Sequence, residues 1–169
     1  MQKLNLFKIK VHFSHIKLIL SDFDGVMTDG RVEVSETGLE SVICSRLDGI
    51  GVRLLKNNSI EIAIISSETN DVVMRRAKKL EINAYNNIVD KAKFVEQLLT
   101  EKNLSINEVL YIGDEINDFE VMKYLDHTAC PSDANFEIQK IAKFILKTKG
   151  GYGVIREIAD LVCSDKIWR

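Results

Sequence analysis

The chain has 169 residues, 46% of them hydrophobic, which is enough apolar material for one well-buried core and too short for two full domains. Its net charge of -2, from 23 basic and 25 acidic residues without a dense basic block, gives no reason to expect nucleic acid or a membrane surface as a partner. We therefore predict a single domain over residues 1–169.

Short apolar runs alternate with amphipathic stretches along the whole chain. In chain order, the runs typical of strands are 16–21, 60–66, 82–85, 109–113, 127–129 and 144–146. The stretches with helical periodicity are 49–57, 69–80, 91–102, 117–124, 134–141 and 154–163. Because parallel strands need a crossover, usually a helix, this alternation predicts an α/β fold: a doubly wound, Rossmann-like parallel sheet with helices on both faces. Ligands of such sheets bind beyond the carboxyl ends of the strands.

One segment, about residues 31–45, interrupts this alternation. Apolar residues alternate with polar ones in Arg31–Val34, and Glu40–Cys44 holds a second short run with Val42 and Ile43, with a glycine-containing turn between them. This pattern predicts a small β-hairpin insertion after the first strand. The hairpin is too small to be a lid, and no other segment is long enough to form a cap domain.

The cysteines and the N-terminus limit the class of protein further. Three cysteines, Cys44, Cys130 and Cys163, lie far apart without CxxC spacing, which argues against a disulfide framework and a zinc site. The first thirteen residues carry lysines among their apolar positions, unlike a signal peptide, and no later stretch approaches membrane-spanning length. These features predict a soluble protein of the cytoplasm.

Carboxylates gather where two of the predicted strands end. Asp22 and Asp24 follow the first strand in SDFDGVMTDG, and Asp114 and Asp118 follow another in YIGDEINDFE. Both pairs should converge at one edge of the sheet, where a cation would offset their mutual repulsion. Oxygen ligands without histidine or cysteine suit Mg²⁺. Asp after a strand is also common turn and cap chemistry, and for Asp118 alone that interpretation stays open.

These residues resemble a known family. DFDGVMTDG, Ser66, Lys91 and GDEIND look like the four motifs of the haloacid dehalogenase superfamily of phosphatases, over nearly the whole chain. TDG, the DGIG that begins at Asp48, and GGYGVIRE resemble the capless branch typified by 3-deoxy-D-manno-octulosonate 8-phosphate phosphatase. That branch also includes phosphatases of nine-carbon keto-deoxy sugar acids and the C-terminal domains of some sialic acid cytidylyltransferases.

The resemblance implies a role for each motif residue. Asp22 would be the nucleophile that forms an aspartyl-phosphate, and Asp24 the general acid and base. Asp22, the backbone carbonyl of Asp24 and Asp114 would hold Mg²⁺, while Asp118 would orient these ligands from behind.

Two further motif residues would bind the transferring phosphoryl group. Ser66 would donate hydrogen bonds to it, and Lys91 would be the stabilising cation. Ser66 is also a plausible helix N-cap, and a lysine on a first helical turn is usually just solvated. Lys93 competes with Lys91 for the role, but Lys91 stands at the family's spacing before Asp114.

The substrate implied by the resemblance is a small sugar acid phosphate. The eight-carbon phosphatases have Gly-Arg after the second motif, whereas this chain has Ser67 and Glu68; the nine-carbon enzymes carry Glu at that place and Lys about three helical turns later, matched here by Glu68 and Lys79. Their spacing is compatible with one helical face. Glu68 as a helix cap and Lys79 as a solvated base is the alternative. Arg75 or Arg76 could pair with the sugar carboxylate, and the resemblance favours Arg76.

The branch assembles as tetramers in which the hairpins pack together, so we expect a homotetramer. Two positions depart from the pattern: Leu47 stands where the branch has Arg, and Glu115 where it often has a second Asp. A phospho-receiver domain would instead place adjacent acids at the first strand. A noncatalytic assembly module would have lost Asp22 or Asp24, and both are intact.

Overall fold

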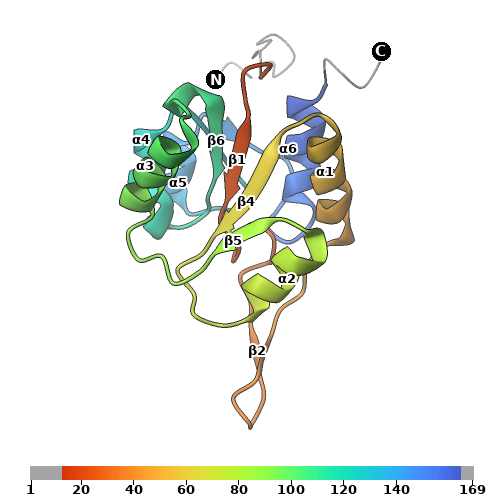
Figure 1. Ribbon diagram of the computed structural model, residues 1–169. Coiled ribbons are helices and arrows are strands. Elements are labelled where there is room, and N and C mark those ends of the chain that lie inside the picture. The colour runs from red at the N-terminus through yellow and green to blue at the C-terminus, as the bar shows by residue number, and fades with distance from the viewer. Residues whose placement is uncertain (1–12, 165–169) are drawn as a thin grey trace, which may run out of the picture.

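The computed structural model, which describes residues 13–164, is built around one parallel sheet (Figure 1). Six strands lie in the order β5-β4-β1-β6-β7-β8, and every neighbouring pair is parallel. The strands are β1 Leu18–Ser21, β4 Glu61–Ile65, β5 Asn83–Tyr85, β6 Val109–Ile112, β7 His127–Cys130 and β8 Phe144–Ile145. The predicted α/β fold with a parallel sheet is confirmed.

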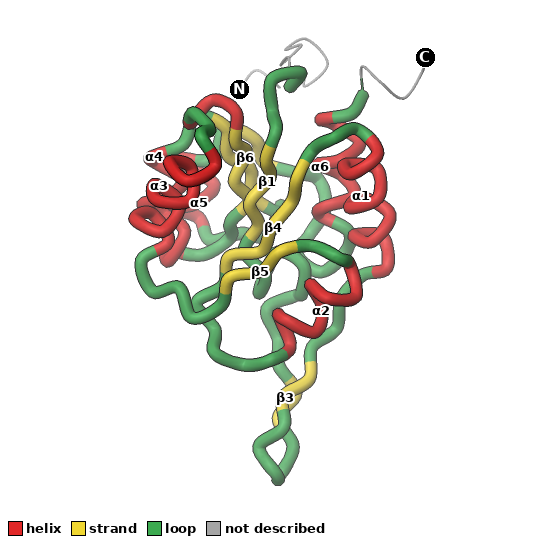
Figure 2. The backbone as a smooth tube through the Cα atoms, viewed as in Figure 1, coloured by secondary structure: helices red, strands yellow, loops and turns green. Residues whose placement is uncertain are grey.

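Helices cover both faces of the sheet, as Figure 2 shows. One face carries α1 Arg46–Asn57, α2 Val72–Leu80 and α6 Val154–Val162; the other carries α3 Lys91–Lys102, α4 Phe119–Tyr124 and α5 Phe136–Ile141. Side chains of a strand point alternately to its two faces. In β1, Ile19 accordingly packs into the core under α1, α2 and α6. Leu18 and Leu20 pack into the core under α3, α4 and α5. The central strands are therefore apolar throughout, as expected of a parallel sheet covered on both faces.

The predicted hairpin is present and projects away from the two layers of helices (Figure 1). It consists of β2 Glu33–Val34 paired antiparallel with β3 Glu40–Ser41. The only other element between β1 and β4 is α1, so residues 13–164 contain no cap domain. None of the helices in this range is long and apolar enough to cross a membrane. The N-terminal segment on which the signal-peptide argument rests lies almost wholly outside the described residues.

The observed helix starts confirm one of the predictions and correct two others. The predicted bounds of α3 are confirmed, with the Asp90 side chain accepting from Lys93 N. The predicted start of α1 at Gly49 is wrong: Ser45 caps the helix, which begins at Arg46. The predicted start of α2 at Thr69 is also wrong, since that helix begins at Val72.

The DGIG stretch joins α1 to α6. The buried Asp48 Oδ1 accepts a hydrogen bond from Ile155 N at 3.0 Å. This replaces a side-chain cap on α6, because the N-cap residue Gly153 has no side chain to offer. Burial raises the pKa of Asp48 to about 6. At Gly51 an added Cβ would lie 2.6 Å from Ile155 O, so the absence of a side chain there sets how closely the two helices approach.

Gly51→Ala is expected to destabilise the protein by about 1–3 kcal/mol, because α1 and α6 must move apart to admit the new methyl group. Gly49→Ala is the matched control on the same helix. Its Cβ would meet only Leu80 Cδ2 at 3.4 Å, and removing a helical glycine gains up to about 1 kcal/mol. Urea unfolding of both variants checks this, and a Gly51→Ala protein as stable as Gly49→Ala would contradict it.

Candidate active site

Loops that follow β1, β4 and β6 meet at the carboxyl edge of the sheet and line a pocket of about 310 Å³. Because these three strands are neighbours, residues far apart in the sequence come together there. The lining consists of Asp22, Asp24, Gly25, Gly30, Ser66, Ser67, Glu68, Asp114, Glu115 and Asn117. The pocket thus contains five of the side chains that the sequence proposed for the site.

The loop after β1 is shaped by contacts that only glycine permits. Gly25 has a φ of +80°, and an added Cβ would lie 1.8 Å from Asp114 Oδ2. Thr28 Oγ1 accepts hydrogen bonds from Gly25 N and Gly30 N and donates one to Asp24 Oδ1 at 3.2 Å. The loop therefore brings the Asp24 side chain and Asp114 to the same pocket.

The loop before α6 supports this segment from the other side. Gly151 N donates to Val26 O at 3.0 Å, and an added Cβ at Gly150 would lie 2.0 Å from Gly25 O. Gly150 is itself buried, and its N–H donates to Asp133 Oδ1. The glycines of GGYG therefore let the chain press directly against the loop that carries Asp22 and Asp24.

Lys91 opens α3 and points into the sheet edge rather than into water. Its side chain is buried, and its Nζ lies 2.7 Å from both Asp22 Oδ2 and Asp118 Oδ1. Burial works to lower the pKa of Lys91, but the charges of Asp22 and Asp118 outweigh it and leave that pKa raised. The interpretation of Lys91 as a solvated lysine is therefore wrong. Lys93, its competitor, is exposed.

Asp118 lies behind the pocket and is completely buried. Its Oδ1 accepts from Lys91 Nζ and from the hydroxyl of Tyr111, each at 2.7 Å, and its Oδ2 accepts from Asp114 N at 2.9 Å. Asp118 is therefore more than a turn residue, because it fixes both a cation and the backbone that carries Asp114. Tyr111 was missed by the sequence analysis; its only signal is a phenol in an otherwise aliphatic strand.

The carboxylates of the pocket form a group suited to a cation. Oxygen atoms of Asp22, Asp114 and Asp118 lie within 4.8 Å of one another. Burial, followed by the charge of Asp118, raises the pKa of Asp114 to about 7, and the same two causes raise that of Asp22 well above its ordinary value. Asp114 Oδ1 is buried and has no hydrogen-bond partner within the described residues. An oxygen-only set with an unpartnered buried acceptor fits a hard divalent cation such as Mg²⁺.

Ser66 and Glu68 lie on the loop between β4 and α2. The buried Ser66 Oγ accepts from Glu68 N at 3.1 Å, which leaves its proton free to donate into the pocket. Since α2 begins at Val72, the interpretation of Ser66 as a helix N-cap is wrong. Glu68 lies outside the helix for the same reason, so the predicted common helical face of Glu68 and Lys79 is wrong as well.

Arg76 and Lys79 do not line the pocket. Arg76 is half-buried on α2, and its Nη2 donates to Ser45 O at 2.7 Å, at the base of the hairpin. Lys79 is exposed in the last turn of that helix. Within residues 13–164, Glu68 is thus the only one of the three proposed substrate-binding residues that reaches the pocket.

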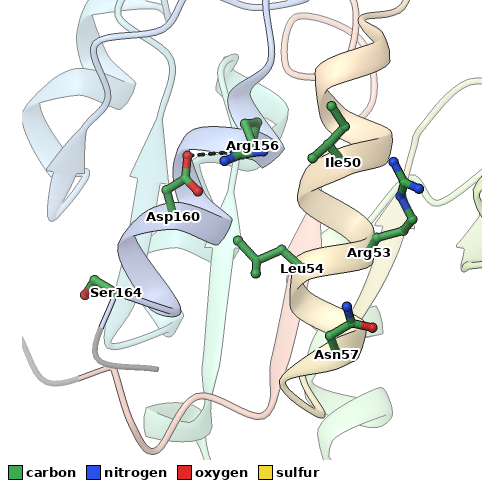
Figure 3. Close-up of a pocket in the computed structure, with 7 residues that line it drawn as sticks. All are labelled: Ile50, Arg53, Leu54, Asn57, Arg156, Asp160 and Ser164. Atoms are coloured by element: carbon green, nitrogen blue, oxygen red, sulfur yellow. Dashed lines mark hydrogen bonds and ion pairs between the residues drawn. The ribbon is translucent and has the colours of Figure 1, made fainter. Parts of the chain in front are cut away.

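A larger groove of about 600 Å³ lies between α1 and α6 (Figure 3). It contains the ion pair of Arg156 Nε with Asp160 Oδ2 at 2.8 Å, facing Ile50 and Leu54 of α1. None of the proposed site residues lines it. The smaller pocket at the carboxyl edge of the sheet is therefore the candidate active site.

Comparison with known proteins bears on this site directly. Residues 50–158, more than half of the chain, match the family model of the haloacid dehalogenase-like hydrolases. The chain belongs to this family. The family resemblance of the motifs is confirmed, and with it the predicted class of enzyme, a phosphoric monoester hydrolase of the haloacid dehalogenase type.

Relatives within the haloacid dehalogenase family cover most of the chain. The chain is 32% identical over 157 residues to the 3-deoxy-D-manno-octulosonate 8-phosphate phosphatase of Yersinia pestis, spanning 91% of this chain and 84% of that protein. With the same enzyme from Escherichia coli K12 it shares 30% identity over 149 residues, spanning 88% and 79%.

Solved structures show the same architecture. The Yersinia pestis phosphatase superposes with a TM-score of 0.87 at 31% identity, covering 90% of this chain and 83% of the other. The Moraxella catarrhalis phosphatase, solved with a magnesium ion, a phosphate ion and a KDO molecule, also gives 0.87, at 27% identity and with 90% and 88% covered. The predicted cofactor, Mg²⁺, is the ion bound in that relative.

Proposed function

We propose that this chain is a Mg²⁺-dependent phosphatase that releases phosphate from a 2-keto-3-deoxy sugar acid phosphate. The observation that carries the proposal is the buried contact of Lys91 with Asp22, which is one of the residues that line the acidic pocket. The Lys91 ammonium group lies against the Asp22 carboxylate, beside carboxylate oxygens that could bind a metal ion. This arrangement suits attack by a carboxylate on an anionic phosphate. The relatives at 30–32% identity are phosphatases of 3-deoxy-D-manno-octulosonate 8-phosphate, which supports a sugar acid phosphate as the substrate class.

Asp22 would attack phosphorus, forming an aspartyl-phosphate as the bond from phosphorus to the sugar oxygen breaks. Asp24 would give its proton to that leaving oxygen and then accept one from the water that hydrolyses the intermediate. Burial raises the pKa of Asp24, which favours the protonated form that the first step needs. The hydrogen bond from Thr28 holds the Asp24 carboxyl group in place at the pocket wall.

Lys91 and Ser66 would bind the phosphoryl oxygens. Two hydrogen-bonding directions of Lys91 Nζ are taken by Asp22 and Asp118, and the third remains for the substrate. The Ser66 hydroxyl, which accepts from Glu68 N, keeps its proton to donate. Both groups offset charge that grows on the phosphoryl oxygens in the transition state.

Asp22, the backbone carbonyl of Asp24 and Asp114 are the groups that would hold Mg²⁺. The bound ion would offset the repulsion between an anionic nucleophile and an anionic phosphate. Asp118 would fix Asp114 through its hydrogen bond to the Asp114 backbone N–H.

For the substrate, we favour a nine-carbon, sialic-acid-type 9-phosphate, with Glu68 contacting the sugar. Glu68 lines the pocket, which supports this assignment. Arg76 and Lys79 would reach the substrate only if it extends beyond the pocket toward α2. The second candidate is the eight-carbon 3-deoxy-D-manno-octulosonate 8-phosphate, which is the substrate for which the relatives are named. A noncatalytic tetramerisation module of a sugar-acid cytidylyltransferase has less support, because Asp22 and Asp24 are both present.

The experiment that separates these candidates is Mg²⁺-dependent phosphate release from the eight-carbon 8-phosphate and from two nine-carbon 9-phosphates. We expect a higher kcat/KM for a nine-carbon substrate, and in Glu68→Gln a loss of about 10- to 100-fold on that substrate, typical of an unmatched hydroxyl contact. Lys79→Met should reduce the same preference, with Lys78→Met, also exposed on α2, as its control. Preference for the eight-carbon substrate, unchanged in Glu68→Gln, would contradict the nine-carbon assignment.

We also propose that the protein works as a homotetramer in the cytoplasm. The hairpin exposes several apolar side chains, namely Val32, Val34, Leu39 and Ile43. Edge strands with exposed apolar residues usually need a partner, and packed hairpins of neighbouring copies would supply it.

A further inference from the structure

Tyr111 is a polar side chain in the apolar interior of β6. Its neighbours along the strand are Leu110 and Ile112, and it packs in the core formed with α3, α4 and α5. The side chain is completely buried, and its hydroxyl donates to Asp118 Oδ1 at 2.7 Å. Burial, followed by the charge of Asp118, raises the pKa of Tyr111, so the phenol keeps its proton and serves as a donor.

The acceptor of this hydrogen bond joins three parts of the site. Asp118 Oδ1 accepts from Tyr111 and from Lys91 Nζ, and Oδ2 accepts from Asp114 N at 2.9 Å and from Glu115 N at 3.4 Å. The carboxylate therefore links β6, the start of α3 and the loop after β6. Of the two side chains that donate to it within residues 13–164, Lys91 is used by the mechanism above and Tyr111 is not.

We infer that Tyr111 is a positioning residue for the phosphatase reaction, acting through Asp118; the inference rests on the function proposed above. Tyr111 holds Asp118 Oδ1 on the core side of the site. Asp118 in turn keeps Lys91 Nζ directed at Asp22 and keeps Asp114 at the pocket. No part of Tyr111 lines the pocket, so its effect reaches the reacting atoms only through these contacts.

The position of Asp118 needs this support because of its surroundings. A carboxylate oxygen of Asp118 already lies within 4.8 Å of oxygens of Asp22 and Asp114, so rotation of its side chain would change its distance from both. Without the phenol, Oδ1 is held by Lys91 alone, and the two move together. A small displacement of the Lys91 charge, which acts in the transition state, would lower kcat. Contacts that bind the substrate in the ground state would remain, so KM would change little.

Tyr111→Phe tests the inference, because it removes one hydroxyl and keeps the ring. With 4-nitrophenyl phosphate as substrate, we expect kcat to fall by about tenfold, the loss of one hydrogen bond to a charged group, with KM within about twofold of wild type. The matched control is Thr128→Val on β7. Thr128 is the register partner of Tyr111, is equally buried, and its hydroxyl accepts from Lys143 N at 3.2 Å without contact to Asp118. The control should lose thermal stability but keep its kcat.

A double-mutant cycle with Asp118→Asn shows whether Tyr111 acts through Asp118. The inference predicts that Tyr111→Phe causes little further loss of kcat in the Asp118→Asn background. An unchanged kcat in Tyr111→Phe, an equal loss in both backgrounds, or an equal loss in Thr128→Val overturns it. Wild-type protein that releases no phosphate overturns the proposed function and this inference together, whereas active wild type with an unaffected Tyr111→Phe overturns the inference alone.

Discussion

Lys91→Met is expected to lower kcat by at least about a hundredfold and to destabilise the protein by about 3–5 kcal/mol. Both effects have one cause. Lys91 Nζ lies 2.7 Å from Asp22 and from Asp118, and all three side chains are buried. Without the ammonium group, the buried carboxylates of Asp22 and Asp118 lose the lysine charge that lies between them, which destabilises the fold. The phosphoryl group of the substrate also loses the positive charge that stabilises the transition state, which lowers kcat.

Lys93→Met is the matched control for this change. Lys93 stands two positions later on the same helical turn, and its side chain is exposed, so its loss should change stability by no more than about 0.5 kcal/mol and leave kcat unchanged. Urea unfolding and phosphate release from 4-nitrophenyl phosphate measure the two effects. If Lys91→Met and Lys93→Met behave alike, the account of Lys91 is wrong.

Gly25→Ala is expected to lower kcat by about a hundredfold or more, because it displaces Asp114. An added Cβ would lie 1.8 Å from Asp114 Oδ2, a distance at which one of the two groups must move. Misplacement of a catalytic group by about 1 Å can cost on the order of a hundredfold in rate. Since Asp114 is a proposed Mg²⁺ ligand, the variant should also need more Mg²⁺ to reach half of its maximal rate.

Gly38→Ala separates this contact from backbone strain. Gly25 and Gly38 have φ values of +80° and +78°, so alanine carries a similar conformational cost of about 1–2 kcal/mol at either position. Nothing lies within 4 Å of a Cβ at Gly38. The Gly38 variant should therefore lose stability while its activity and Mg²⁺ requirement stay near those of wild type. Equal activity of the two variants would show that Asp114 is not displaced.

Features with a local cause were predictable from the sequence. The bounds of α3 follow from Asp90, whose side chain caps the first turn, and from Asn103, which ends the helix with a left-handed backbone. The convergence of Asp22 with Asp114 follows from the parallel pairing of β1 with β6, because neighbouring parallel strands end at the same edge. The alternation of strands and helices was enough to anticipate that both strands end at one edge of the sheet.

Features that depend on contacts between distant residues were not predictable. The loop before α2 makes one such contact: Asn70 Nδ2 donates to Glu40 Oε2 of the hairpin at 3.0 Å. No pattern within residues 66–80 indicates this contact. The same is true of Tyr111, whose importance depends on a hydrogen bond to Asp118 that helical and strand periodicity do not encode.

Glu115 stands where the octulosonate phosphatase branch often has a second Asp, and the structure explains how the longer side chain is accommodated. Its Oε1 accepts from Ile116 N and from Asn135 Nδ2, each at 2.8 Å, so the side chain caps the short helical turn 116–118 and ties it to the start of α5. The longer side chain is thereby held by its own partners. The sequence showed only that an Asp of the family pattern was absent here.

The measurement that tests the central claim most directly is phosphate release from 4-nitrophenyl phosphate by wild type and Asp22→Asn, each with Mg²⁺ and with a chelator. Wild type should release phosphate only with Mg²⁺, and Asp22→Asn should be slower by at least about 10⁴-fold, as expected for loss of a nucleophile. Asparagine keeps the size of Asp22 and an oxygen that can accept from Phe23 N, and Lys91 keeps its contact with Asp118, so the variant should fold, which thermal melting checks. Wild type without activity, or Asp22→Asn as active as wild type, would contradict the account.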